Sequence, residues 1–331
     1  MPSPPVWLSA GRDAWLVEVE EWVSSVVLAT DGGHVLAIES VKENPWGAVL
    51  RVHTPSGVLY FKAPGPSCGH ELPLIRDLGG RWPTLVPDVV AVDNDRSWLL
   101  LVDHGVPMRN LDAHDQVAVL ERLLPDYAEM QAATVDQVAD WLAVGTPDRR
   151  IRHLPEQLDA LLRGASPVGP LQIDDADRAA YLEQLPTLTE VCAELAATPV
   201  PDALDHADLH GTNVFVQARE ARMADWGDAC ITHPFSSLFV PYAFIVAALP
   251  EPEQPAATLR LREVYLESWG APTELHRAFG WAVWIGHVTR AINVAHETLG
   301  EGDDHREIRE LLAGWHAKRS LLDHPDDLIQ P

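Results

Sequence analysis

The sequence predicts an α+β chain with a small sheet-rich lobe in residues 1–103 and a larger helical lobe in residues 104–331. Two observations support this prediction. Short runs of β-branched and aromatic residues, bounded by turn-forming residues, fill the first hundred positions. Beyond Asp103, apolar residues recur at helical spacing instead. The chain has 331 residues, 47% of them hydrophobic, which is enough to bury one large core or two modest ones.

Strands are predicted in the first lobe wherever a short run is rich in β-branched or aromatic side chains. The predicted strands are residues 15–19, 26–30, 35–38, 48–52, 58–61, 89–92 and 98–102. The tight-turn sequence from Thr54 to Gly57 predicts that the strands on either side of it form a hairpin. A helix is expected over residues 69–78. Gly79 and Gly80 are expected to end it, because glycine adopts the left-handed cap conformation.

The second lobe is predicted to be helical, with helical spacing of apolar residues in three regions. These regions are residues 109–165, 176–196 and 255–321. A short β-like interruption at 214–216, with 223–224 as its partner strand, lies inside the region that carries the chemical motifs described below.

The formal net charge of −25 bears on the class of partner. Nucleic-acid backbones and anionic membrane surfaces both attract basic faces, so neither is a predicted partner. Residues 1–103 hold 7 basic and 13 acidic side chains, whereas the remaining residues hold 17 and 36. Two interpretations of this acidic excess stay open: a solvating surface, or attraction for a cationic substrate.

Three cysteines, Cys68, Cys192 and Cys230, are widely spaced and form no C-x-x-C pair. This usage predicts a reducing cytoplasm, without a disulfide framework or a thiolate metal site. The first residues lack the basic flank and apolar run of a signal peptide, which also favours the cytoplasm. The longest apolar stretch, Leu238 to Leu249, is about a dozen residues long and is expected to be a buried helix. The sequence leaves the oligomeric state open.

The motifs H-A-D-L-H-G-T-N and A-D-W-G-D carry the strongest chemical signal. Phosphoryl transfer from a magnesium nucleotide needs one acid to orient a hydroxyl and accept its proton, and Asp208 is the candidate. It also needs hard oxygen ligands for Mg²⁺, and Asn213 and Asp225 are the candidates. Asp228 has two interpretations, as a ligand to a second metal ion or as a helix cap.

The histidines of the first motif allow a different interpretation. His206, Asp208 and His210 have the close spacing of ligands in a transition-metal hydrolase, although the other histidines are scattered. The favoured interpretation is that His206 braces the loop. His210 is expected either to lie near nucleotide phosphates or to be structural.

Lys62 is notable because the chain has only three lysines. Its place at the end of a predicted strand suits a compact ammonium that contacts nucleotide phosphates. Glu71, near the start of the following helix, is its expected partner. No G-x-G-x-x-G or Walker sequence is present, so the expected phosphate loop is an irregular turn from Asn44 to Gly47.

These segments, in this order, resemble the aminoglycoside phosphotransferase and choline kinase-like branch of the protein kinase-like superfamily. The matching segments are Y-F-K at 60–62, H-E at 70–71, W-L-L-L-V-D-H-G at 98–105, H-A-D-L-H-G-T-N at 206–213 and D-W-G-D at 225–228. Only the last two are specific, and Ala207 stands where the family usually has glycine. The resemblance implies a bilobal protein kinase-like fold, with a five-stranded antiparallel sheet and one helix in the N-lobe and a helical C-lobe.

The resemblance also implies roles for the candidate residues. Asp208 is the expected catalytic base, with Asn213 and Asp225 on magnesium. Lys62 and Glu71 are the expected ion pair that holds the phosphates.

By the same resemblance, the backbone of a hinge formed by Val102, Asp103 and His104 is expected to bind the adenine of ATP. GTP stays open as an alternative nucleotide. No activation segment ending in A-P-E follows the D-W-G-D segment, which favours a small-molecule acceptor over a protein. The helices at 109–165 and 235–320 are expected to supply the acceptor pocket.

The predicted function is therefore ATP- and Mg²⁺-dependent phosphorylation of a hydroxyl group on a small polar or cationic molecule. An aminoglycoside, another antibiotic, an amino sugar or an amino alcohol would fit. Two alternatives stay open: a catalytically silent nucleotide-binding module on the same scaffold, and a metallohydrolase that uses His206, Asp208 and His210.

Overall fold

The computed structural model describes residues 4–166, 169–270, 272–298, 304–324, 326 and 328. The chain divides into two compact units. The first comprises Met1–Val106 and Val216–Gly227, and the second comprises Pro107–Phe215 and Asp228–Pro331. The candidate site residues are therefore distributed over both units.

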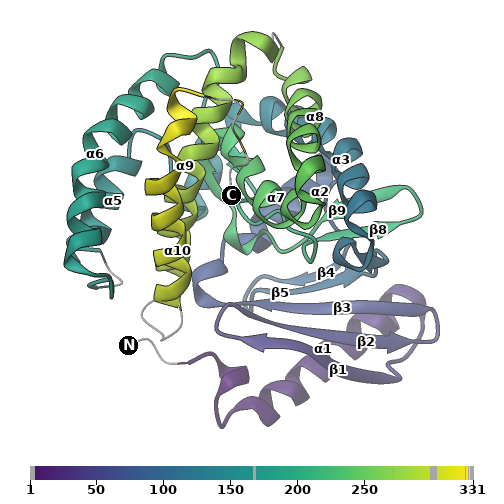
Figure 1. The fold of residues 1–331 in the computed structure, drawn as a ribbon. Coiled ribbons are helices and arrows are strands. Elements are labelled where there is room, and N and C mark those ends of the chain that lie inside the picture. Colours follow the sequence, from purple (N-terminus) through teal and green to yellow (C-terminus); the bar gives the residue numbers. More distant parts are fainter. Residues whose placement is uncertain are drawn as a thin grey trace. The chain divides into compact units, whose positions relative to one another are not determined.

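The first unit contains a five-stranded antiparallel sheet with the strand order β1–β2–β3–β5–β4 (Figure 1). The strands are β1 (Ala37–Asn44), β2 (Gly47–Thr54), β3 (Gly57–Pro64), β4 (Val89–Asp93) and β5 (Trp98–Val102). β2 and β3 form the predicted hairpin, in which Thr54 pairs with Gly57 across a two-residue turn. The strands predicted at 89–92 and 98–102 are also confirmed, and they pair with each other.

Helix α1 (Arg12–Asp31) occupies residues that were predicted to be strands, so the predictions at 15–19 and 26–30 are wrong. The β-branched residues of this segment suggested strands, but its buried residues follow a helical period. The positions buried on its inner face are Trp15, Val19, Val23 and Val27. A spacing of four places them in one stripe on a helix, and packing of that stripe outweighs β-propensity.

Aromatic side chains join α1 to the sheet. The ring of Trp15 lies 6.0 Å from that of Phe61 on β3, in an edge-to-face arrangement. Trp22 packs edge-to-face against Phe61 at 5.9 Å and against Trp98 on β5 at 5.8 Å. These rings form the centre of the core of the first unit. Their packing holds strand β3, which carries Lys62, in place.

Helix α2 (Glu71–Arg81) confirms the helix predicted at 69–78 but continues beyond it. Gly79 and Gly80 lie within the helix, and Trp82 is the C-terminal cap, so the predicted glycine end is wrong. The segment Val216–Gly227 adds most of a hairpin formed by β8 (Val214–Gln217) and β9 (Glu220–Met223).

The second unit is mainly helical, as predicted. Its helices are α3 (Ala113–Ala133), α4 (Val138–Ala143), α5 (Leu154–Leu162), α6 (Asp175–Ala196), α7 (Phe239–Phe244), α8 (Gln254–Glu267), α9 (Pro272–Thr298) and α10 (Asp304–Ala317). Its short strands β7 (Ala203–Asp205) and β10 (Cys230–Thr232) pair antiparallel. The remaining two-residue strand is β6 (Val106–Pro107). Helices α9 and α10 lie side by side, as do α5 and α6 (Figure 1).

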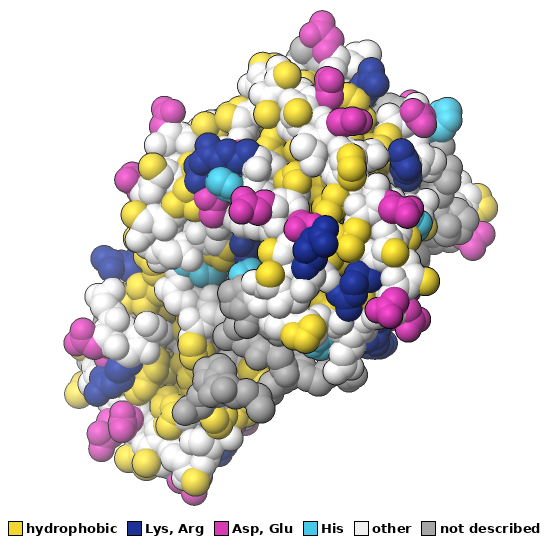
Figure 2. Space-filling view, turned by 90° about the vertical axis from the view of Figure 1, so that its left-hand side faces the viewer, with side chains coloured by type: hydrophobic (Ala, Val, Ile, Leu, Met, Phe, Trp, Pro, Cys, Tyr) yellow, Lys and Arg dark blue, Asp and Glu magenta, His cyan; other side chains and the backbone are white. Residues whose placement is uncertain are grey.

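This mixture of an antiparallel sheet in the N-terminal part and helices in the C-terminal part confirms the predicted α+β fold class. Among the described helices, none combines the length and the apolar character needed to cross a bilayer. On the face shown in Figure 2, Asp and Glu side chains are scattered among basic and hydrophobic ones. No single acidic patch dominates that face.

Candidate active site

The loop that carries Asp208 follows strand β7 and is fixed by the buried carboxylate of Asp205. One oxygen of Asp205 accepts hydrogen bonds from the Ala207 N–H at 2.9 Å, the Tyr127 hydroxyl at 3.2 Å and the Ser237 hydroxyl at 2.8 Å. The Tyr127 oxygen in turn accepts the His206 N–H at 2.8 Å. A buried carboxylate requires such donors, so this network specifies the loop conformation. Sequence reasoning missed Asp205, although an acid directly before the H-A-D motif was a usable signal.

Ala207 adopts a left-handed backbone conformation, with φ of 60°. This region disfavours a side chain and favours glycine, which explains why a glycine would suit this position. The turn at Ala207 immediately precedes Asp208 and so determines the direction in which its side chain leaves the loop.

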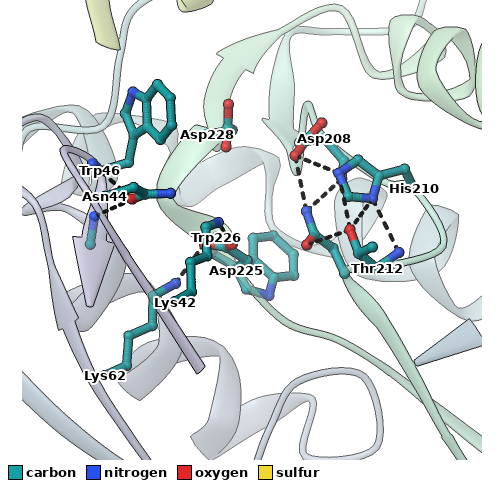
Figure 3. Close-up of polar contacts among 12 residues, drawn as sticks. Lys42, Asn44, Trp46, Lys62, Asp208, His210, Thr212, Asp225, Trp226 and Asp228 are labelled. Atoms are coloured by element: carbon teal, nitrogen blue, oxygen red, sulfur yellow. Dashed lines mark hydrogen bonds and ion pairs between the residues drawn. The ribbon is translucent and has the colours of Figure 1, made fainter. Parts of the chain in front are cut away.

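Three side chains surround the carboxylate of Asp208, and Figure 3 shows one of them, His210, beside it. Asn213 donates its amide N–H to Asp208 Oδ2 at 2.9 Å, and His210 Nε2 lies 3.2 Å from the same oxygen. Arg290 on α9 places Nη2 3.3 Å from Asp208 Oδ1. The predicted base is thus held on both oxygens, and only 9% of the residue is exposed.

The charge state of Asp208 follows from these neighbours. Burial acts to raise the pKa of this carboxyl group, but the Arg290 guanidinium and the hydrogen bond from His210 outweigh it. The pKa of Asp208 therefore lies below its ordinary value, and the side chain is an anion at neutral pH. An anion is the form that can accept a proton.

The amide of Asn213 is oriented by its own hydrogen bonds. Its Nδ2 donates both to the backbone oxygen of Asp208 at 3.0 Å and to the Asp208 carboxylate. Its Oδ1 accepts the Thr212 hydroxyl at 3.5 Å and keeps a second lone pair for a further partner. Such an oxygen fits Mg²⁺, which prefers hard oxygen donors and needs few of them from the protein.

The two histidines of this loop accept hydrogen bonds from its backbone. His206 is fully buried, and its Nδ1 accepts the Asp208 N–H at 3.4 Å. His210 Nδ1 accepts the Thr212 N–H at 3.1 Å, so its Nε2 carries the hydrogen that faces Asp208. Among the described residues, no group of three His, Cys, Asp or Glu side chains could hold a metal ion. The arrangement therefore gives no support to the metallohydrolase alternative.

Arg290 connects the proposed base to two further acids. Its Nη1 lies 2.5 Å from Asp228 Oδ1, and its Nη2 lies 3.5 Å from Glu307 Oε1. Asp228, predicted as a metal ligand or a helix cap, is therefore an ion-pair partner in this structure. Sequence reasoning missed Arg290. Its signal was an arginine within the mainly apolar stretch from Trp281 to Ala295, where a charge requires a partner.

In the first unit, Lys62 lies between two carboxylates. Its Nζ is 2.5 Å from Glu71 Oε1 and 2.6 Å from Asp225 Oδ1. The same Glu71 oxygen accepts the Trp226 N–H at 3.1 Å. Burial disfavours the ammonium, but Asp225 and Glu71 outweigh it and hold the pKa of Lys62 above its ordinary value. The predicted partnership of Lys62 and Glu71 is present, and it extends to Asp225.

Lys42 on β1 is a second cation in this cluster, with its Nζ 3.7 Å from Asp225 Oδ2 (Figure 3). It was not predicted, although it is one of only three lysines. The neighbouring turn is formed by Asn44, whose Oδ1 accepts the N–H groups of Trp46 and Gly47 at 3.1 and 3.0 Å. These two N–H groups, which were expected to approach phosphates, already have a partner within the turn.

The predicted hinge residues have local roles in the first unit. Val102 donates its N–H to the Asp88 oxygen at 3.0 Å, and Asp103 Oδ1 accepts the Gly105 N–H at 3.0 Å. His104 is buried, and its Nε2 accepts the Asp88 N–H at 2.8 Å. Burial lowers the pKa of His104, so it is neutral. The adenine-binding role of this segment stays a prediction.

The structure therefore brings the predicted residues together in two groups. In the second unit, Asp208, His210, Asn213 and Asp228 belong to one network that includes Arg290. In the first unit, Lys62, Glu71 and Asp225 form the other group.

Comparison with protein families gives one finding. The model of the phosphotransferase enzyme family matches residues 37–278. This range includes the sheet of the first unit, the Asp208 loop and the Asp225 segment. Comparison with curated protein sequences gives no match.

Solved structures with this fold come from several organisms. Choline kinase from Cryptosporidium parvum Iowa II is 14% identical, with a TM-score of 0.62 over 88% of this chain and 91% of that one. Choline kinase LicA from Streptococcus pneumoniae is 13% identical, with a TM-score of 0.58 over 91% and 99%. The aminoglycoside phosphotransferase APH(4)-Ia, in a ternary complex with AMP-PNP and hygromycin B, is 14% identical, with a TM-score of 0.57 over 90% and 98%. At these identities, the similarity establishes the fold.

Proposed function

Because the chain belongs to the phosphotransferase enzyme family, we propose that it transfers the γ-phosphoryl group of ATP to a hydroxyl group of a small molecule. The hydroxyl oxygen forms a bond to the γ-phosphorus, and the bond from that phosphorus to the β–γ bridging oxygen breaks. The hydroxyl proton passes to Asp208. The products are ADP and a phosphate monoester.

The observation that carries this proposal is the pairing of Asp208 with Asn213. A carboxylate held by an amide at 2.9 Å has one fixed orientation, and the pairing leaves the amide oxygen available as a ligand. A base must be positioned before it can assist a weak nucleophile. We assign Asp208 as the base and Asn213 as a ligand to Mg²⁺.

In the first unit, we assign Lys62 and Glu71 to the nucleotide phosphates and Asp225 to the metal ion. An ammonium held by two carboxylates is charged and fixed, which suits contact with a phosphate group. Asp225 is 35% exposed at its side chain and keeps oxygen lone pairs for a further ligand. Bound Mg²⁺ would neutralise charge on the phosphates.

The acceptor is proposed at the level of a hydroxyl-bearing small molecule. The similar structures are named for choline and aminoglycosides, so these compounds belong in a first panel. Amino sugars and amino alcohols extend the panel. The expectation of a cationic acceptor came from the net charge of the whole chain.

The test is ADP release by the purified protein with ATP or GTP, Mg²⁺ and the acceptor panel. Asp208→Ala should lower kcat by about 10²–10⁴-fold, the usual contribution of a general base, while nucleotide affinity and circular dichroism stay unchanged. Asp126→Ala, at an exposed site on α3, is the matched control and should keep full activity. Removal of Mg²⁺ by a chelator should abolish turnover until Mg²⁺ is restored.

Near-normal turnover in Asp208→Ala would refute the assigned base. Nucleotide binding without ADP release across the whole panel would instead support a catalytically silent module.

A further inference from the structure

The second unit contains a cavity of about 300 Å³ that no assigned role explains. It lies among α7, α9 and the short helix Lys318–Leu322, and it is partly open. Phe239, Tyr242 and Val283 supply apolar walls, and His287 and Lys318 supply polar groups. The volume is at the lower end of the range for small-molecule pockets, roughly 300–1,000 Å³, and predicts a compact ligand.

His287 contributes an uncharged ring to the lining of this cavity. Its Nδ1 donates to the Trp284 oxygen at 3.2 Å, so its Nε2 carries a lone pair. Its ring packs on Phe239 at a centroid distance of 4.3 Å. Burial lowers the pKa of His287 to about 3, which keeps the ring neutral at physiological pH.

Among the described residues that line the cavity, Lys318 is the one with a formal charge. In the part of the chain that the structure describes, no ion pair or hydrogen bond joins its ammonium to another residue. Burial lowers the pKa of Lys318, and no acid among the described residues opposes this effect. A partly buried ammonium without a carboxylate is unfavourable, so an anionic ligand would stabilise it.

Two contacts relate the cavity to Asp208. His287 and Arg290 are three positions apart on α9, which places their side chains on neighbouring turns of one face, and Arg290 contacts Asp208. Ala243 lines the cavity, and the next residue, Phe244, packs against the ring of His210 at 6.0 Å. The lining residues His287 and Ala243 are therefore helix neighbours of Arg290 and Phe244, which contact Asp208 and His210.

Building on the proposed function, we propose that this cavity binds the acceptor, and that the acceptor is a compact hydroxy acid with an apolar or aromatic body. Its acidic group pairs with Lys318, its body lies against Phe239 and Tyr242, and its hydroxyl is the group that is phosphorylated. In this reaction the acceptor oxygen bonds to the γ-phosphorus of ATP, ADP leaves, and the hydroxyl proton passes to Asp208. No carboxylate is found among the described residues that line the cavity, so these residues do not select an amine.

The test uses three probes with one benzyl alcohol body: 4-(hydroxymethyl)benzoate, 4-(hydroxymethyl)benzylamine and uncharged benzyl alcohol. Their affinities are measured by titration calorimetry, and their turnover is measured by ADP release. The benzoate should bind about 10-fold or more tightly than the amine, as expected for one charge-assisted contact. Lys318→Met should remove this preference without changing ATP affinity, and Lys318→Arg should retain it.

A second pair of variants tests whether the probes bind in this cavity. Ala243→Leu adds bulk at an exposed position that lines the cavity and should weaken binding of the benzoate and the uncharged probe alike. Ala248→Leu, also exposed but outside the lining residues, is the matched control and should leave binding unchanged. Lys318→Met should not reduce thermal stability, because it removes an unpaired charge.

The proposal is overturned if the amine binds as well as the benzoate, if the preference survives in Lys318→Met, or if none of the probes binds at millimolar concentration. These outcomes are distinct from failure of the phosphotransferase assignment. Turnover of cationic acceptors with loss in Asp208→Ala would keep that assignment and refute the cavity proposal. Normal turnover of the benzoate in Asp208→Ala would refute the assigned base and leave the acceptor site in the cavity standing.

Discussion

Backbone strain at Ala207 lies directly beside the proposed base. A non-glycine residue with φ of 60° costs about 1–2 kcal/mol relative to the right-handed region. Asp225, the proposed metal ligand of the first unit, also has a positive φ, of 64°. Strained residues of this kind persist where surrounding contacts determine the backbone, and they cluster at functional sites. At Ala207, those contacts come from the hydrogen bonds to Asp205.

Ala207→Gly should therefore stabilise the protein. Glycine removes the strain but increases the entropy of the unfolded chain, so the expected net gain is about 0.5–1 kcal/mol in the free energy of unfolding. Urea denaturation measures it. The same substitution at Ala193, at an exposed position inside α6, should instead cost about 1 kcal/mol. Equal losses at both positions would contradict the strain argument.

At the scale of elements, one face of α9 contacts two acids of the second unit, Asp208 and Asp228. Arg290 and Asn293 are three positions apart, and both contact Asp228. Arg290 pairs with its carboxylate, and Asn293 Nδ2 donates to its backbone oxygen at 3.2 Å. Arg149 fixes Asn293 through a hydrogen bond of 2.8 Å to its Oδ1. The helix thereby sets the position of Asp208 as well, through Arg290.

Arg290→Met should lower both stability and rate. Removal of the guanidinium leaves the mostly buried Asp208 and Asp228 without a counterion, which should cost roughly 3 kcal/mol in the free energy of unfolding. A displaced base should also lower kcat by about 10–100-fold, with a smaller change in the KM for ATP. Arg306→Met, at an exposed ion pair on α10, should cost at most about 1 kcal/mol and leave kcat unchanged. A wild-type kcat in Arg290→Met would show that α9 does not position the base.

Helix α1 shows where element prediction failed. Its valines have strand propensity, yet its buried side chains recur every fourth residue. That spacing was visible in the sequence, and following it across residues 15–27 would have identified the helix. Residues 15–19 and 26–30, taken as two separate runs, are each too short to show this helical period.

At the scale of the whole molecule, buried histidines make stability dependent on pH. Burial lowers the pKa of His233 and of His287 to about 3, from an ordinary value of 6.5. Between these values the unfolded chain binds more protons than the folded chain. The free energy of unfolding therefore falls as pH decreases from 6.5 toward 3, by about 1.4 kcal/mol per pH unit for each histidine.

His233→Asn should weaken this dependence. Asparagine keeps a side-chain acceptor for the Phe235 N–H, which His233 Nδ1 accepts at 3.3 Å, but it does not titrate. Urea denaturation at pH 6 and pH 4 should show a slope that is lower by about 1 kcal/mol per pH unit than in the wild type. His324→Asn, at an exposed position, serves as the control. An unchanged slope in His233→Asn would refute a buried neutral imidazole.

The sequence by itself determined the fold class, and it singled out most residues of the two networks that form the proposed site. The motif around Asp208 and Asn213 is local, so its spacing along the chain already implied its chemistry. The sheet hairpin and the helices of the second lobe were also recognisable, because periodicity and turn residues act over short distances.

Only the tertiary structure decided which distant residues complete each network. Arg290 and Asp208, and Lys62 and Asp225, are far apart in sequence, and no local pattern pairs them. The chemistry of the cavity around Lys318 was equally hidden, since it depends on helices that meet only after folding. Net charge is a sum over the whole surface, whereas recognition depends on the few side chains that packing brings to one cavity.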